Sequence, residues 1–269
     1  MRNMPQLHSF QILYTFKCII MVCVFAHLAQ FIKWCKGQSQ LNIIIYKCEE
    51  MRIDMRYITI ALAKGRLAKN ALDIFEHIGI KCDEMKDEKT RKLIFTNEEL
   101  GIRFFLAKPS DVPTYVEYGA ADIGVVGKDT ILEENRNVYE VLDLGFGKCR
   151  MCVCGPAPAR ELLKHHERIR VASKYPNIAR EYFYNKKHQT VDIIKLNGSV
   201  ELGPLVELSD VIVDIVETGS TLRENGLEVL EEVCPLSARM IVNPVSMQME
   251  ADRIRKLVGA IREQLKIQA

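Results

Sequence analysis

The sequence lacks most features that would place the protein in a specialised class. Its formal net charge is only +2 over 269 residues, so composition gives no reason to expect a nucleic-acid partner. Its nine cysteines are odd in number and irregularly spaced, which argues against a disulfide framework. No internal repeat is visible. With 48% hydrophobic and 27% charged residues, the composition is that of a globular protein of one large or two small domains.

The cysteines also lack a complete metal-binding pattern. Cys149, Cys152 and Cys154 form a C-x-x-C-x-C cluster, but a zinc or iron–sulfur site needs a fourth ligand and usually a second close pair. Neither is nearby in the sequence. The stretch is otherwise typical of a strand, so the pattern favours buried, reduced cysteines and predicts no metal site by direct motif.

Residues 1–54 differ in composition from the rest and contain an apolar tract, Phe10–Ile32. Its longest charge-free part, Cys18–Ile32, is shorter than the roughly 20 residues that span a bilayer, and no small-residue cleavage site follows it. Three interpretations stay open: a translated upstream region that is not native protein, a disordered tail, or a membrane anchor. We favour the first, because Met51 and Met55 lie just before the first convincing strand. We also expect a cytoplasmic protein without a membrane span.

From Tyr57 onward, strand and helix patterns alternate, which predicts an α/β protein with mainly parallel sheets. Residues 57–63 form the first predicted strand. Lys64, Gly65 and Arg66 form a turn, and apolar residues at helical spacing follow. Two cations beside a helix N-terminus suit a polyphosphate, although a solvated basic turn is the plainer interpretation.

A second stretch of this kind is more specific. Val211–Val216 is an apolar run that contains Asp214, which predicts a buried strand. Glu217–Thr221 is a short polar turn around Gly219. Apolar residues then recur at helical spacing up to Val233, so we expect a helix there. Strand, small polar turn and helix together make an anion-binding site.

Two carboxylates narrow the ligand of this turn. A site for phosphate alone gains nothing from Asp214 and Glu217, whereas ribose hydroxyls can donate hydrogen bonds to both. The pattern resembles the loop that binds phosphoribosyl pyrophosphate (PRPP) in phosphoribosyltransferases, and it lacks the lysine of a Walker A loop and the glycine spacing of a Rossmann fingerprint. An ordinary strand-to-helix connection capped by Thr218 or Ser220 is the alternative.

Other polar residues are expected at the same place in the fold. Asp111, Gly127 and Glu201 each fall at the carboxyl end of a predicted strand, where ligands bind in parallel α/β sheets. Asp111 and Asp129 are equally well explained as simple helix N-caps. Two glycines within residues 142–150 mark the predicted crossing between two domains.

Several long stretches together resemble a known family. They include ITIALAKGRL, KPSDVPTYVEYGAADIGVVGKD, KYPNIAREYF and DVIVDIVETGSTLRENGLEVLEE. These resemble the short form of ATP phosphoribosyltransferase, the first enzyme of histidine biosynthesis. The resemblance implies two α/β domains like those of the type II periplasmic-binding-protein fold, formed by residues 55–148 plus 239–269 and by residues 149–238. Residues 1–54 have no counterpart in it.

The resemblance also implies a reaction and a partner. N1 of the adenine of ATP joins the anomeric carbon of PRPP, and pyrophosphate leaves with the assistance of Mg²⁺ carried by the substrate. The chain ends at Ala269, before the C-terminal regulatory domain of the long form. We therefore expect a separate regulatory subunit resembling histidyl-tRNA synthetase, in a hetero-oligomer.

Roles for single residues follow from the motifs and the resemblance together. The PRPP-binding residues are expected to be Glu201, Asp214, Glu217, Thr218, Gly219, Ser220 and Thr221. The residues for ATP or pyrophosphate are expected to be Lys64, Gly65, Arg66, Asp111 and Gly127. Asp214, Glu217 and Lys64 are the candidate catalytic residues. The rival interpretation is a ligand-binding or sensing module on the same fold, without turnover.

Overall fold

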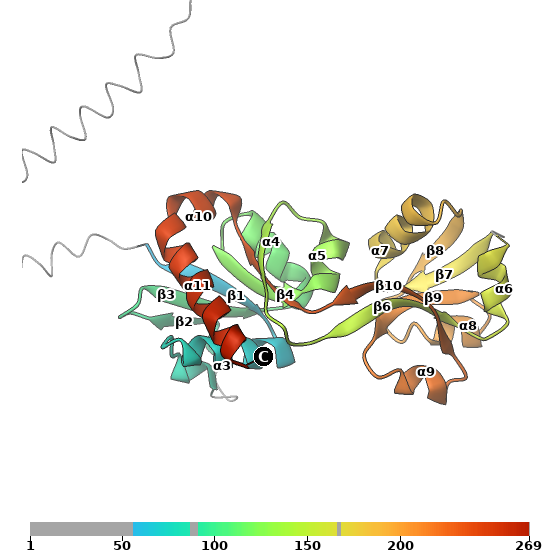
Figure 1. Ribbon diagram of the computed structural model, residues 1–269, viewed down its shortest axis with the longest axis horizontal. Coiled ribbons are helices and arrows are strands. Elements are labelled where there is room, and N and C mark those ends of the chain that lie inside the picture. Colours follow the sequence, from blue (N-terminus) through green and yellow to red (C-terminus); the bar gives the residue numbers. More distant parts are fainter. Residues whose placement is uncertain (1–55, 87–90, 166–167, 269) are drawn as a thin grey trace, which may run out of the picture. The chain divides into compact units, whose positions relative to one another are not determined.

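The computed structural model describes residues 56–86, 91–165 and 168–268 (Figure 1). The predictions for residues 1–54 lie outside the described residues. The strands form two mixed sheets, each built around a parallel core, and helices cover them. Within the described ranges, no helix is long and apolar enough to cross a membrane.

The first sheet has six strands in the order β2-β3-β1-β4-β11-β5. Its central strands β3, β1 and β4 run parallel, while β2, β11 and β5 join antiparallel at the two sides. The strands are β1 (Ile58–Ala63), β2 (Ile94–Asn97), β3 (Ile102–Ala107), β4 (Ile123–Gly127), β5 (Tyr139–Asp143) and β11 (Ala238–Val242). The last strand of the chain thus returns to the first sheet.

The second sheet has five strands in the order β10-β6-β9-β7-β8. Strands β9, β7 and β8 run parallel to one another. Strand β6 pairs antiparallel with β9, and β10 pairs antiparallel with β6. The strands are β6 (Cys149–Gly155), β7 (Ile169–Ser173), β8 (Val191–Lys195), β9 (Val211–Val216) and β10 (Glu228–Leu236). The chain passes from the first sheet to this one through the glycine-containing segment between β5 and β6. The domain limits at residues 148 and 238 stay predictions.

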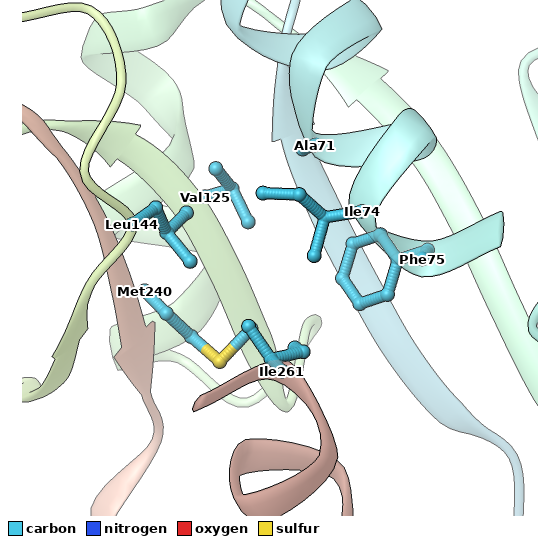
Figure 2. A pocket seen from close by; sticks show the side chains of 7 residues that line it. All are labelled: Ala71, Ile74, Phe75, Val125, Leu144, Met240 and Ile261. Carbon is cyan, nitrogen blue, oxygen red and sulfur yellow. The ribbon is translucent and has the colours of Figure 1, made fainter. Parts of the chain in front are cut away.

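Apolar faces of the helices and sheets form the cores. The helices beside the first sheet are α3 (Arg66–His77), α4 (Val112–Glu117), α5 (Lys128–Glu134), α10 (Pro244–Met249) and α11 (Ala251–Gln268), with 3₁₀ turns at Asp83–Lys86 and Pro109–Asp111. Figure 2 shows one meeting point, where Ile74, Phe75 and Ile261 approach Val125 and Met240. The gap among these side chains is too small for a water molecule, so it is part of the packed core and not a ligand site.

The helices of the second sheet are shorter. They are α6 (Ala159–Lys164), α7 (Pro176–Arg180), which continues as a π-helical segment over Glu181–Lys186, α8 (Leu202–Leu205) and α9 (Ser220–Glu224). The prediction of a helix up to Val233 is wrong, because α9 ends at Glu224 and β10 follows. Gly226 adopts φ +70°, a left-handed conformation that stops the helix.

The predicted strand position is confirmed for all three cysteines of the cluster, and burial is confirmed for Cys152 and Cys154, whereas Cys149 is half-buried. Cys149, Cys152 and Cys154 lie on β6 and are free thiols, as are Cys82 and Cys234. Burial raises the pKa of Cys154 to about 12 and also raises that of Cys152, so these thiols stay protonated and inert.

Candidate active site

The carboxyl ends of the parallel strands carry the predicted residues in both sheets. In the first sheet Lys64, Gly65 and Arg66 follow β1, Asp111 follows β3, and Gly127 is the last residue of β4. The backbone N–H of Lys64 donates to the carbonyl of Ala107 at 2.9 Å, which ties the turn to the end of β3. The side chains of Lys64 and Arg66 are both exposed at this edge of the sheet.

The N-cap interpretation is right in position for Asp111 and wrong for Asp129. Asp111 occupies the cap position of α4 but accepts no cap hydrogen bond from its amides. Gly127, not Asp129, is the cap residue of α5, and Asp129 lies in the first turn. Burial raises the pKa of Asp129, and the backbone N–H of Thr130 opposes this effect. Asp129 is therefore a partly desolvated carboxylate at the carboxyl-end edge of the first sheet.

In the second sheet, Asp214 is half-buried near the end of β9. Burial raises its pKa to about 6, the charge of Glu201 adds to the rise, and the N–H of Ile215 and the charge of Lys174 oppose it. The charge of Glu201, which lies on the connection after β8, thus reaches Asp214 on β9. Perturbed carboxylates of this kind are typical of functional sites.

The polar turn after β9 is ordered by its own contacts. Gly219 adopts φ +71°, and the hydroxyls of Thr218 and Ser220 lie 3.1 Å apart. The Arg223 guanidinium donates to the Thr218 carbonyl at 3.1 Å. Thr218, Ser220 and Thr221 are exposed. Because α9 has only five residues, its dipole contributes less than the predicted long helix would. Backbone N–H groups and hydroxyls carry the anion-binding capacity.

One ion pair joins the two sets of predicted residues. Arg66 donates to Glu217 at 3.0 Å across 151 positions of sequence, with 67% and 53% of the two side chains exposed. So exposed a pair contributes little to stability. Asp111 is not brought into this contact, since its carboxylate accepts only from the neighbouring Ser110 hydroxyl among the described hydrogen bonds.

A second contact between the sheets involves residues that the sequence analysis did not assign. The Glu133 carboxylate on α5 accepts from the backbone N–H groups of Asn177, at 3.0 and 3.2 Å, and of Ile178, at 3.1 Å. It thereby caps α7. One turn earlier on α5, the charge of Asp129 adds to the effect of burial in raising the pKa of Tyr175. Applying the strand-end rule to β7 would have pointed to this region.

The donor set does not form a dedicated metal cage. Within the described ranges, no group of three or more His, Cys, Asp or Glu side chains is placed to hold a metal ion. The arrangement offers separate carboxylates, exposed cations and a hydroxyl-rich turn. It suits an anionic, hydroxyl-bearing ligand that brings any metal with it.

Comparisons with known proteins agree with this geometry. The family model described as HisG, ATP phosphoribosyltransferase, matches residues 108–263. The ATP phosphoribosyltransferase of Lachnospira eligens is 78% identical over 214 residues, covering 80% of this chain and 99% of that protein. This chain belongs to the ATP phosphoribosyltransferase family. An enzyme family favours turnover over the rival interpretation of a binding module.

Further relatives support the same assignment. The ATP phosphoribosyltransferase of Lachnoclostridium phytofermentans is 77% identical and covers 78% of this chain and 98% of its own length. A solved structure, the ATP phosphoribosyl transferase (HisG:HisZ) complex from Thermotoga maritima, matches with 32% identity and a TM-score of 0.65. It covers 78% of this chain and 98% of that chain. The predicted α/β fold with two mainly parallel-cored sheets is confirmed.

Proposed function

We propose that this chain transfers the 5-phosphoribosyl group of PRPP to N1 of the adenine of ATP, in the first step of histidine biosynthesis. The observation that carries the assignment of residues is the Arg66–Glu217 contact, which joins a basic turn after β1 to an acidic, hydroxyl-rich turn after β9. A basic edge suits a diphosphate, and the acidic edge suits a ribose.

The chemistry requires no protein nucleophile. The bond from the anomeric carbon to the diphosphate breaks with its electron pair going to the leaving oxygen, and the N1 lone pair forms the new bond. The adenine then loses a proton from its 6-amino group. Asp214 and Glu217 accept hydrogen bonds from the ribose hydroxyls, and their charge stabilises the positive ribose of the transition state. Lys64 and Arg66 bind the departing diphosphate, and Thr218–Thr221 bind the 5′-phosphate.

Magnesium enters as part of the substrate in this scheme. Mg²⁺ is usually held by one or two carboxylates together with substrate phosphates and keeps several waters. The separate carboxylates described above fit such an arrangement better than a cage would. The ion's role is to neutralise charge on the leaving diphosphate.

We infer that a regulatory subunit completes the assembly. The relatives that match are themselves of the short form, because the 214 matched residues span 99% of the Lachnospira eligens protein. The solved relative of Thermotoga maritima is a HisG:HisZ complex. A hetero-oligomer of this chain with a partner of the HisZ kind follows by analogy, in the cytoplasm.

A turnover assay tests the proposed function. Purified full-length chain is mixed with ATP, PRPP and Mg²⁺, with and without a HisZ-type subunit, and phosphoribosyl-ATP is measured. We expect product in the presence of the partner. Product without the partner would keep the reaction and remove the dependence. Ligand binding without product in either mixture would favour the binding module.

The exposed ion pair gives a prediction about Arg66. Since substrate must replace Glu217 as the partner of its guanidinium, Arg66→Met should raise the KM for PRPP about tenfold, the effect of one charged hydrogen bond. Its thermal midpoint should stay close to that of the wild type, because both side chains are largely exposed.

The matched control is Arg168→Met, which breaks an equally exposed pair with Asp192 on β8. Steady-state kinetics and thermal unfolding are measured on both variants. Equal KM values in the two variants would contradict a substrate role for Arg66.

A further inference from the structure

One cation at the ligand-binding edge has no role in the scheme above. Lys174 directly follows β7, the strand that lies between β9 and β8 in the parallel part of the second sheet. It therefore stands at the same edge as Glu201 and the end of β9 that carries Asp214. Its side chain is exposed, and its ammonium lies 5.9 Å from the centre of the Tyr175 ring. Within the described part of the chain, its ammonium forms no ion pair.

The backbone on both sides of Lys174 is fixed. The buried Ser173 hydroxyl donates to the Val213 carbonyl on β9 at 2.6 Å and accepts from the Tyr175 N–H at 2.8 Å. Tyr175 is only 9% exposed. Burial, followed by the charge of Asp129 on α5, raises its pKa. A lysine on such a rigid turn can hold its charge at a defined position, which is what binding a reacting group requires.

The charges near Lys174 are those of the proposed ribose site. The ammonium lowers the pKa of Asp214 and that of Asp129 against the effect of burial, so it lies within electrostatic reach of both carboxylates. Three other titratable groups interact electrostatically with Asp214. They are the carboxylate of Glu201 on the connection after β8, the neutral Tyr175 next to β7, and the neutral thiol of Cys154 on β6. Lys174 is thus the cation that couples to Asp214. Without it, a diphosphate beside Asp214 and Glu201 would meet two carboxylates with no cation from β7 to offset their charge, and only Lys64 and Arg66 of the first sheet would bind it.

We propose that Lys174 is a catalytic residue that binds the diphosphate of PRPP beside Asp214. The inference rests on the proposed function. It adds a cation of the second sheet to Lys64 and Arg66 of the first sheet as ligands of the diphosphate. The diphosphate is bonded to the anomeric carbon of the ribose. A cation beside Asp214, the carboxylate proposed to bind the ribose hydroxyls, therefore lies where it can bind the diphosphate. When that carbon–oxygen bond breaks, the electron pair goes to the diphosphate oxygen. The ammonium stabilises the added charge and transfers no proton.

The test compares Lys174→Met, Lys174→Arg and the control Lys164→Met, each in the full-length chain with its regulatory subunit. Lys164 is an exposed lysine on α6 of the same sheet, so its replacement removes the same charge. Binding of PRPP with Mg²⁺ is measured by calorimetry, and kcat by product formation. We expect Lys174→Met to lose about ten- to hundredfold in PRPP affinity and to lower kcat. Lys174→Arg should recover most of the affinity, and Lys164→Met should match the wild type.

A pH profile separates a direct role from a structural one. Without Lys174 the pKa of Asp214 rises, so the acid limb of kcat/KM should move to higher pH in Lys174→Met but not in Lys174→Arg. PRPP affinity and a pH profile equal to those of Lys164→Met would overturn the proposal. Failure of the proposed function gives a different result, because the wild type itself would then bind PRPP without forming product. The PRPP affinities of the variants would still show whether Lys174 binds the diphosphate.

Discussion

Asp214→Asn should lower kcat by about a hundredfold or more, the usual loss when a charge that stabilises a transition state is removed. The half-buried carboxylate of Asp214 lies near the end of β9, beside the turn proposed to bind the phosphate. The amide keeps the shape and one acceptor but loses the negative charge that the positive ribose requires. The measurement is steady-state turnover with ATP, PRPP and Mg²⁺.

The pH dependence gives this prediction a signature. Because the pKa of Asp214 is about 6, the wild type should lose kcat/KM as the pH falls below about 6 and Asp214 becomes protonated. Asp214→Asn should lack that limb. Asp192→Asn, which changes a half-exposed carboxylate on β8, two strands away from β9 in the same sheet, should keep both the rate and the limb. An acid limb that persists in Asp214→Asn would assign it to another group.

The same substitution should stabilise the fold. The pKa of Asp214 is raised in the folded state, from 3.8 to about 6, so the folded protein binds the proton more tightly than the unfolded chain. The corresponding stabilisation is present at low pH and is lost as the pH rises through about 6. At pH 8, Asp214→Asn should therefore gain about 1–2 kcal/mol in the free energy of unfolding. Below the ordinary pKa of 3.8 the two proteins should converge. A variant that loses activity and stability together would indicate a structural role.

Local patterns in the sequence predicted the strands that carry the site. Continuous apolar runs identified β1 and β9, because a parallel strand that is buried on both faces consists mostly of apolar residues. The polar residues that follow these strands identified both halves of the site. Lys174 was missed because the residues after β7 contain neither a glycine nor an acid pair.

Two features could not be read from spacing. The apolar residues of β10 recur at intervals that mimic a helix, since register shifts after Val229 and Glu232 break the usual strand alternation. The Arg66–Glu217 and Glu133–Asn177 contacts join residues far apart in the chain. Only the arrangement of the two sheets brings these partners together, and no local periodicity records it.

Gly219→Ala should raise the KM for PRPP about ten- to hundredfold, because the turn that we assign to the 5′-phosphate cannot keep its shape. At φ +71°, a side chain costs about 1–2 kcal/mol. The new methyl group would also lie 3.3 Å from the Arg223 guanidinium, which holds the Thr218 carbonyl. Relieving this contact moves the guanidinium or the turn, and the hydroxyls of Thr218 and Ser220 then lose their common orientation.

Gly226→Ala is the matched control for this prediction. Gly226 lies at the other end of α9 with φ +70°, and an added methyl group there meets no atom within 4 Å. Both variants should therefore lose similar stability in thermal unfolding, about 1–2 kcal/mol. Only Gly219→Ala should lose PRPP affinity, as measured by calorimetry, while its affinity for ATP stays unchanged. If the two variants bind PRPP equally well, the turn after β9 does not hold the phosphate, and the anion must bind at another strand end.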